Sequence, residues 1–116
     1  MSLFGFLSKL KSSTSPSAIE HELLEEACRK GECHVIDVRE IHEYAAGHIP
    51  GAKNHPLSSF DPAKLPTDKP VVLVCQAGAR STRALQAAHA AGREDVVHYP
   101  PGTSGWKARG GAVHKL

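Results

Sequence analysis

An uninterrupted apolar run, VVLV at residues 71–74, leads directly into CQAGARS and then into the alanine-rich stretch STRALQAAHAAG. Such a run predicts a strand covered on both faces, and the stretch after it predicts a helix ended by Gly92. Further strands are predicted at HVIDV (34–38), AKNHP (52–56) and VVHYP (96–100), with helical segments at HELLEEACRK (21–30) and IHEYAAG (41–47). Alternating strands and helices predict an α/β fold, a central parallel sheet of about five strands flanked by helices on both faces.

The length and composition of the chain fit one globular domain. Its 116 residues are 41% hydrophobic and 22% charged, which is typical of a chain that buries a core. We expect an N-terminal amphipathic extension and Ser-rich linker over residues 1–16 and a single domain over residues 17–116. Ser17 and Glu20 match a capping box at the start of the domain's first helix, which Gly31 then ends.

The extension has apolar residues at positions 3, 6, 7 and 10, a spacing that predicts a short amphipathic helix. The apolar stretch is too short to span a bilayer, and lysines follow it rather than precede it, unlike in a secretory signal. We expect the helix to dock on the domain's own surface, with no firm membrane insertion. A weak dimer contact and weak membrane attachment are the alternatives.

Charge and cysteine usage narrow the partners and the compartment. The net charge is +2 and the basic residues are scattered, which argues against nucleic acid as a partner. The three cysteines, Cys28, Cys33 and Cys75, form no disulfide framework and indicate a reducing, cytoplasmic location. The eight histidines include no pair at convincing metal spacing, so we expect no metal site. Cys28 and Cys33, late in a helix and just before a strand, are expected to be structural.

Cys75 lies where the apolar strand ends and a helix begins, with Gly78 in the turn between them. Glycine lets the turn curl so that successive backbone amides point inward, while the helix start and Arg80 add positive charge. These groups are expected to lower the thiol pKa below its free value of about 8.5, which favours the nucleophilic thiolate. Ser81 can cap the helix or hydrogen-bond into the loop.

A second set of polar residues follows another strand. Asp37 and Arg39 come at the carboxyl end of the strand predicted over residues 34–38. Sites in parallel sheets lie at the carboxyl ends of strands, so we expect these two side chains near Cys75. Three interpretations of Cys75 itself remain open at this point: a buried structural cysteine, the nucleophile of a phosphatase, and a carrier of sulfur.

Four segments, in this order, resemble the motifs of the single-domain rhodanese family: VIDVRE (35–40), EYAAGHIPGA (43–52), VVLVCQAGARS (71–81) and GTSGWKARG (102–110). The resemblance implies a rhodanese-like fold and a sulfurtransferase that needs no cofactor. Cys75 would take sulfane sulfur from a donor such as thiosulfate and hold it as a persulfide. A thiophilic acceptor, which is cyanide, a thiol or a protein, would then receive the sulfur.

The resemblance also implies roles for single residues. Cys75 is the nucleophile, and the Arg80 side chain attracts or orients the anionic donor. Asp37 and Arg39 match an Asp-x-Arg element near the pocket, with an ordinary structural ion pair as the equal alternative. The substrate-binding loop, whose amides cradle the outer sulfur, comprises Gln76, Ala77, Gly78, Ala79, Arg80 and Ser81.

Outside the loop, His48 and Trp106 lie in the matching segments, and we interpret both as structural. His48 is expected to be a hydrogen-bonding residue of the fold, with a proton shuttle as the alternative. Trp106 is expected to be a wall of the core or pocket, with a substrate contact as the alternative. Pro101 departs from the pattern, because the family commonly has glycine there. The proline removes an amide from a segment, the Trp-containing turn, that approaches the active loop.

Loop length separates sulfur transfer from phosphatase chemistry. Four residues lie between Cys75 and Arg80, one fewer than in cysteine phosphatases, and a narrower ring of amides suits one sulfur atom better than a phosphoryl group. No residue is an evident acid for a leaving oxygen. The alternative from another class is a noncatalytic or low-turnover sulfur relay or sensing module that binds a partner protein, which the N-terminal extension would favour.

Overall fold

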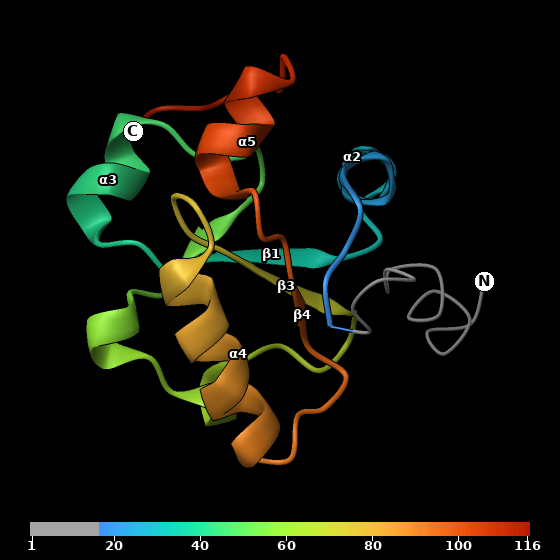
Figure 1. The fold of residues 1–116 in the computed structure, drawn as a ribbon, viewed down its shortest axis with the longest axis vertical. Helices are drawn as coiled ribbons and strands as arrows, with labels where there is room; N and C mark the ends of the chain where they lie inside the picture. The colour runs from blue at the N-terminus through green and yellow to red at the C-terminus, as the bar shows by residue number, and fades with distance from the viewer. Residues whose placement is uncertain (1–16) are drawn as a thin grey trace.

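The computed structural model describes residues 17–116, so the predicted N-terminal extension lies outside the described residues. The strands are β1 (His34–Asp37), β2 (Lys53–Asn54), β3 (Val71–Val74) and β4 (Val97–His98). They form one parallel sheet in the order β2-β1-β3-β4, in which Asp37 is paired with Val74 and Leu73 with His98 (Figure 1). Parallel pairing of β1, β3 and β4 brings the residues that follow each strand to the same edge of the sheet.

The sheet has four strands among the described residues, rather than about five. At the free side of β4, the chain makes only one parallel bridge, between Ala18 and His98. The Ile19 amide donates to the His98 carbonyl at 3.0 Å, and the His98 amide donates to the Ser17 carbonyl at 2.9 Å. Helix α2 begins three residues after Ala18, so this pairing ends before a fifth strand forms.

Helix α2 (His21–Lys30) shows that the predicted capping box at Ser17 is wrong. The residue before the helix is Glu20, in an extended conformation with φ −72° and ψ 151°, and it makes no side-chain cap. Pairing with β4 holds Ser17 in the sheet, and this outweighs the local preference for a cap. The predicted end is confirmed, because Gly31 adopts φ 65° and its amide binds the Cys28 carbonyl.

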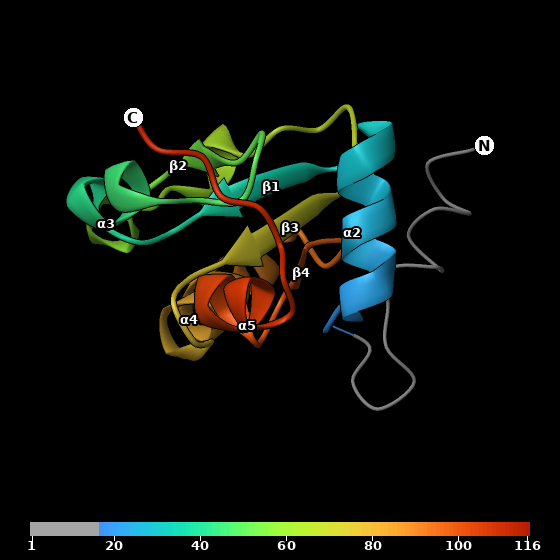
Figure 2. The same cartoon turned by 90° about the horizontal axis from the view of Figure 1, so that it is seen from above.

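The helices cover both faces of the sheet, as predicted. In Figure 1, α2, α3 (Ile41–Ala46) and α5 (Gly102–Ala108) lie above the strands, and α4 (Ala79–Ala90) lies below them. Figure 2 looks down on this arrangement, so that α5 overlaps α4. Strand residues alternate between the two layers, as the two-residue period of a strand requires. Val72 and Val74 pack with Leu24 of α2 and Trp106 of α5, whereas Leu73 packs with Leu85 of α4.

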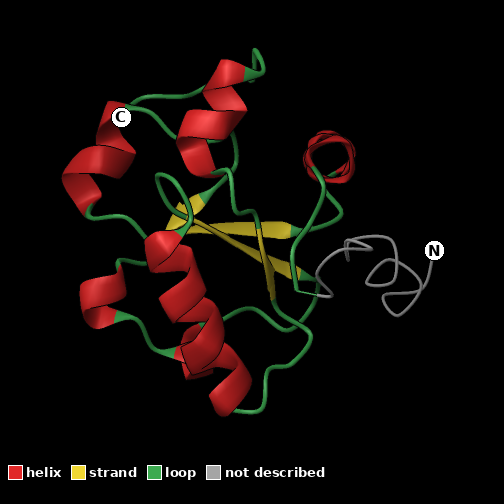
Figure 3. Cartoon of the chain, viewed as in Figure 1, coloured by secondary structure: helices red, strands yellow, loops and turns green. Residues whose placement is uncertain are grey.

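Short helices form in two segments where no helix was predicted, the proline-rich stretch and the Trp-containing turn. Figure 3 shows helical turns in the proline-rich stretch, which are the 3-10 helices η1 (Leu57–Ser59) and η2 (Pro62–Lys64). The Trp-containing turn is a full helix, α5. No helix within residues 17–116 is long and apolar enough to cross a membrane.

Candidate active site

The carboxyl ends of β1, β3 and β4 meet around Cys75. Cys75 follows β3 directly, the loop of residues 75–78 leads into α4, and Asp37 and His98 end the neighbouring strands. The loop lies beside the first turn of α5 (Figure 1). The topology therefore brings the predicted cysteine loop and the predicted Asp37–Arg39 pair to one edge of the sheet.

The loop curls because of Gly78, which has φ 105° and is the N-cap of α4. Its amide donates a hydrogen bond to the Cys75 sulfur over 3.1 Å. A side chain could not replace its hydrogen, since a Cβ atom would lie 2.7 Å from the Pro100 carbonyl oxygen. The Cys75 residue is only 1% exposed, so its sulfur lies at the floor of the loop.

Helix α5 holds the loop carbonyls on the side away from the sulfur. The Thr103 amide donates to the Cys75 carbonyl at 2.8 Å, and the Ser104 amide donates to the Gln76 carbonyl at 3.1 Å. Gly102 has φ 67° and makes room for this contact, because a Cβ atom there would lie 2.3 Å from the Gln76 oxygen. With its carbonyls bound by α5, the loop presents amides to the sulfur.

The predicted direction of the thiol pKa is confirmed. Burial raises the pKa of the Cys75 thiol, but hydrogen bonds from the Ser81 amide and hydroxyl and from the Gly78 and Ala77 amides outweigh it and lower the pKa. Each of these donors stabilises the thiolate more than the thiol. The cysteine is therefore prepared to act as a nucleophile without an adjacent base.

Ser81 lies in the first turn of α4 and hydrogen-bonds into the loop, while Gly78 takes the cap position. Its Oγ donates to the Gly78 carbonyl at 3.2 Å and lies 2.9 Å from His98 Nδ1. Burial lowers the pKa of His98, which favours a neutral ring. His98 is not among the residues predicted for the site. Its signal in the sequence is a polar side chain within the otherwise apolar predicted strand VVHYP.

The Arg80 side chain, which is predicted to attract or orient the anionic donor, is paired with a carboxylate of the same chain. Its two terminal nitrogens donate to the two carboxylate oxygens of Glu43 on α3, at 2.6 and 2.9 Å. Arg80 in turn lowers the pKa of Glu43 to about 2. Glu43 is thus a residue of the site that sequence reasoning missed, and its signal was its place in the EYAAGHIPGA segment.

Asp37 and Arg39 form a buried ion pair, with Arg39 Nη2 2.8 Å from Asp37 Oδ2. Arg39 is 4% exposed and also donates to the Gly47 carbonyl and to Gln76 Oε1, at 2.7 and 3.1 Å. The pair therefore joins β1 to the loop through Gln76. This geometry is that of a structural ion pair that supports the loop.

The other residues named from the sequence take structural positions. His48 is buried, and its Nδ1 lies 2.8 Å from the Tyr44 carbonyl, which agrees with a hydrogen-bonding role in the fold. Trp106 is buried in the core, and its ring nitrogen donates to the Ala112 carbonyl. Cys28 and Cys33 are free and pack against the same core. Within residues 17–116 no three metal-ligating side chains gather.

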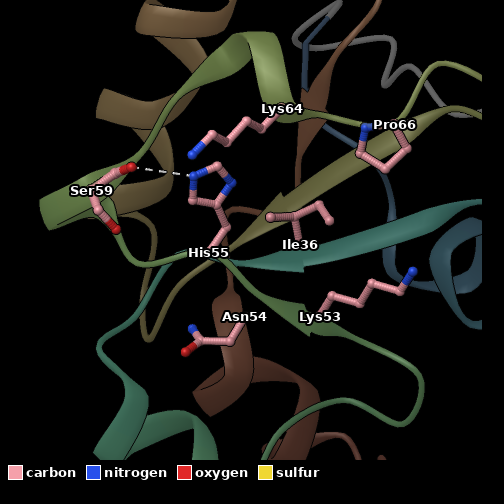
Figure 4. Close-up of a pocket in the computed structure, with 7 residues that line it drawn as sticks. All are labelled: Ile36, Lys53, Asn54, His55, Ser59, Lys64 and Pro66. Atoms are coloured by element: carbon pink, nitrogen blue, oxygen red, sulfur yellow. Dashed lines mark hydrogen bonds between the residues drawn. The ribbon is translucent and has the colours of Figure 1, made fainter.

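A separate cavity of about 450 Å³ lies beside β2 (Figure 4). The His55 ring is held at its rim, where Nε2 accepts from the Asp61 amide at 3.1 Å. None of the residues that line it belongs to the cysteine loop; they are Ile36, Lys53, Asn54, His55, Ser59, Lys64 and Pro66. The cavity is therefore not part of the sulfur cradle.

The model of the rhodanese-like domain family matches residues 20–109 of the chain. The chain belongs to this family. YqhL of Bacillus subtilis, an uncharacterized protein, is 42% identical over 88 residues, which are 72% of this chain and 70% of YqhL. Thiosulfate sulfurtransferase GlpE of Pseudoalteromonas translucida is 34% identical over 77 residues, 64% of this chain and 72% of GlpE.

Solved structures agree with the sequence match. The human single-domain sulfurtransferase TSTD1 has a TM-score of 0.71 at 28% identity, covering 80% of this chain and 96% of TSTD1. Several further curated relatives are longer proteins, of which the match spans less than half. At the level of the family, sulfur transfer is the activity that these names support.

In this rhodanese-like domain Pro101 fits the backbone at the start of α5. Pro101 has φ −62° and ψ −23°, which a proline ring favours, and it precedes the first residue of α5. Its ring packs against Gly105, where a Cβ atom would lie 2.3 Å from the proline Cβ. The close approach to the loop is made by the next residue, Gly102, so the departure at Pro101 falls on the side of α5.

Proposed function

We propose that the protein is a sulfurtransferase that carries sulfane sulfur on Cys75, between a donor such as thiosulfate and a thiophilic acceptor. The acceptor is cyanide, a thiol or a protein. The observation that carries the proposal is the Cys75 sulfur itself, buried at the base of a loop whose Gly78 amide donates to it at 3.1 Å. Such an environment favours a thiolate and stabilises negative charge that forms beside it.

In the loading step, the Cys75 thiolate attacks the outer sulfur of the donor. A new S–S bond forms to Cys75 while the donor's own S–S bond breaks, and its electron pair leaves with sulfite when the donor is thiosulfate. Cys75 is left as a persulfide whose terminal sulfur is anionic. The loop amides that are not bound by carbonyls can donate to this sulfur, in the way an oxyanion hole holds oxygen.

In the unloading step, the acceptor attacks the terminal sulfur. The persulfide S–S bond breaks, its electron pair returns to the Cys75 sulfur, and the thiolate is restored. Because the leaving group in both steps is a sulfur-centred anion, first sulfite and then the Cys75 thiolate, no proton transfer to a leaving oxygen is required. The absence of a base in contact with the Cys75 sulfur, among the described residues, is compatible with this chemistry.

The proposal is tested by intact-mass spectrometry after incubation with thiosulfate. The wild-type chain is expected to gain about 32 Da, the mass of one sulfur. Cys75→Ala is expected to gain nothing, whereas Cys28→Ala and Cys33→Ala, which alter the two other thiols, should gain the sulfur normally. No adduct on the wild-type chain with either thiosulfate or cysteine persulfide, or an adduct that survives in Cys75→Ala, would overturn the proposal.

The alternative function is a low-turnover sulfur relay that receives and delivers sulfur on a partner protein. The pairing of Arg80 with Glu43 favours it, because it leaves less positive charge for a small anionic donor. Thiosulfate:cyanide kinetics distinguish the two: rapid turnover supports the enzyme, and a persulfide that forms without turnover supports the relay. Hydrolysis of an aryl phosphate would support a phosphatase instead.

We also propose a cytoplasmic location. The three cysteines are free, and Cys75 must be a thiolate to attack the sulfur donor. A reducing compartment preserves that form of the residue.

A further inference from the structure

Both arginines beside the sulfur cradle are neutralised by carboxylates of the same chain. Arg39 is paired with Asp37, and Arg80 is paired with Glu43 through two hydrogen bonds. The loop residues between Cys75 and Arg80 carry no charged side chain. The cradle therefore attracts anions mainly through backbone amides, with little net charge from side chains.

We propose that Glu43 is a specificity-determining residue, which holds Arg80 away from the donor and so favours thiol persulfides over dianionic thiosulfate. The inference rests on the proposed function, since it names the donor class of the same Cys75 site. A thiol persulfide carries at most one negative charge on its sulfur atoms, whereas thiosulfate carries two charges close to the atom that is attacked. A site without free cationic side chains discriminates against the second donor.

The transfer from a thiol persulfide balances without another reactant. The Cys75 thiolate attacks the outer sulfur of R–S–SH, an S–S bond forms to Cys75, and the donor's S–S bond breaks with its electron pair going to R–S⁻. The proton stays with the transferred sulfur or passes to the departing thiolate. Sulfur changes carrier and no net oxidation occurs.

Glu43 is fixed in a position from which it cannot easily release Arg80. Its Oε1 also accepts from the Glu40 amide at 3.2 Å, as part of a capping box at the start of α3. Its side chain is 26% exposed and that of Arg80 is 32% exposed, so water screens the pair only in part. Separating the pair to meet a donor would break two charge-assisted hydrogen bonds.

The Glu43→Gln substitution removes the carboxylate charge with little change in the shape of the side chain. The glutamine oxygen can still accept from Arg80 and from the Glu40 amide, while the Arg80 charge is no longer cancelled. A rapid-mixing experiment compares how fast thiosulfate and cysteine persulfide load Cys75. At low ionic strength we expect the rate of thiosulfate loading to rise about tenfold in Glu43→Gln. The Arg80 charge that is no longer cancelled adds a Coulomb attraction for the dianion that corresponds roughly to this change in rate. Cysteine persulfide loading should change less than about twofold.

Glu40→Gln is the matched control, because Glu40 lies at the same helix start and its side chain accepts from Ser58 and from the Glu43 backbone amide rather than from Arg80. The glutamine oxygen can keep these bonds. Glu40→Gln should leave both loading rates unchanged. The gain with thiosulfate should also disappear in the double variant Glu43→Gln/Arg80→Gln. An unchanged thiosulfate rate in Glu43→Gln, an equal change with both donors, or a gain that persists in the double variant would each overturn the inference.

A measurement on the wild-type chain covers the case in which Glu43→Gln fails to fold. A neutral cradle predicts that the thiosulfate loading rate depends weakly on salt, whereas an unpaired Arg80 predicts a steep fall as salt rises. A steep fall overturns the inference. Failure of both donors to form a persulfide on the wild-type chain instead contradicts the proposed function itself.

Discussion

The Cys75 sulfur is surrounded by hydrogen-bond donors rather than by a base. Within the described residues, Ser81 supplies the one side-chain donor to the sulfur, and the other donors are backbone amides. The Ser81 hydroxyl also contacts His98 Nδ1. A hydroxyl has one hydrogen, so the direction in which it points decides whether the sulfur is stabilised as thiolate. A neutral His98 that carries its proton on Nδ1 would donate to Ser81, and the hydroxyl hydrogen would then be shared between two acceptors, the Gly78 carbonyl at 3.2 Å and the Cys75 sulfur.

Replacement of Ser81 with alanine should raise the pKa of the Cys75 thiol. The hydroxyl bond lowers that pKa, so its loss is expected to raise it. The rate at which iodoacetamide alkylates Cys75, followed by peptide mass spectrometry from about pH 5 to pH 10, gives the midpoint. The thiolate fraction near neutral pH should fall.

Thr82→Ala is the control for this prediction. Thr82 Oγ1 donates to the Gly78 carbonyl at 2.8 Å. The substitution therefore removes a neighbouring hydroxyl without removing a hydrogen-bond donor to the Cys75 sulfur. Its alkylation midpoint should match that of the wild-type chain. A midpoint that moves equally in both variants would show that the hydroxyl of Ser81 has no particular effect on the thiol.

At the scale of elements, the approach of α5 to the cysteine loop depends on Gly102. Gly102→Ala places a Cβ atom 2.3 Å from the Gln76 oxygen at a residue with φ 67°, so the loop and α5 must separate. We expect a loss of about 3 kcal/mol in the free energy of unfolding. Urea denaturation measures the loss, and Cys75 alkylation should slow in the same variant.

Gly110→Ala is the control that separates the effect of backbone strain from the effect of the contact between α5 and the cysteine loop. Gly110 has φ 82° but a Cβ atom there meets nothing within 4 Å. This variant should lose only about 1 kcal/mol and keep the alkylation rate of the wild-type chain. Equal losses in the two variants would contradict the importance of the α5 contact.

The ion pair between α3 and α4 should make stability depend on pH. The folded pKa of Glu43 is about 2, below its ordinary value of 4.5. Its contribution is therefore complete above about pH 4.5 and is lost as the pH falls toward 2. With partial exposure discounted, we expect about 2 kcal/mol from this group.

Urea denaturation between about pH 7 and pH 3 measures this contribution. The difference in free energy of unfolding between the wild-type chain and Glu43→Gln should be constant above about pH 5 and shrink below about pH 4.5. Arg80→Gln should remove the same pH dependence, because Arg80 is the main cause of the lowered Glu43 pKa. Parallel curves for all three proteins would be inconsistent with the pair.

The elements differ in how well local sequence determined them. Strand β3, its glycine turn and α4 follow from patterns contained in about twenty residues, so they could be predicted. Helix α5 has two glycines in seven residues and no clear period, and tertiary bonds from Thr103 and Ser104 to the loop help to hold it. The pairing of Ser17 with β4, and of Glu43 with Arg80, joins residues far apart in the sequence, which no local pattern reveals.

At the scale of the whole molecule, the described residues 17–116 supply a core layer on each face of the sheet. If the domain begins at residue 17, as predicted, deletion of residues 1–16 should leave the thermal unfolding midpoint within a few degrees of that of the full chain. Deletion of residues 1–19 should cost about 2 to 4 kcal/mol, because it removes buried Ile19 and the bridge to β4. Differential scanning calorimetry measures both, and a large loss in the shorter deletion would place the boundary elsewhere.

The bonds from α5 to the cysteine loop also have a consequence for the order of synthesis. During translation Cys75 is made before Thr103 and Ser104, whose amides bind the loop carbonyls. A chain still attached to the ribosome at that stage has a thiol but not the completed ring of amides around it. Full nucleophilicity is thus acquired only after α5 has been made and has folded against the loop, so chains that lack α5 are less prone to pick up sulfur or an oxidant.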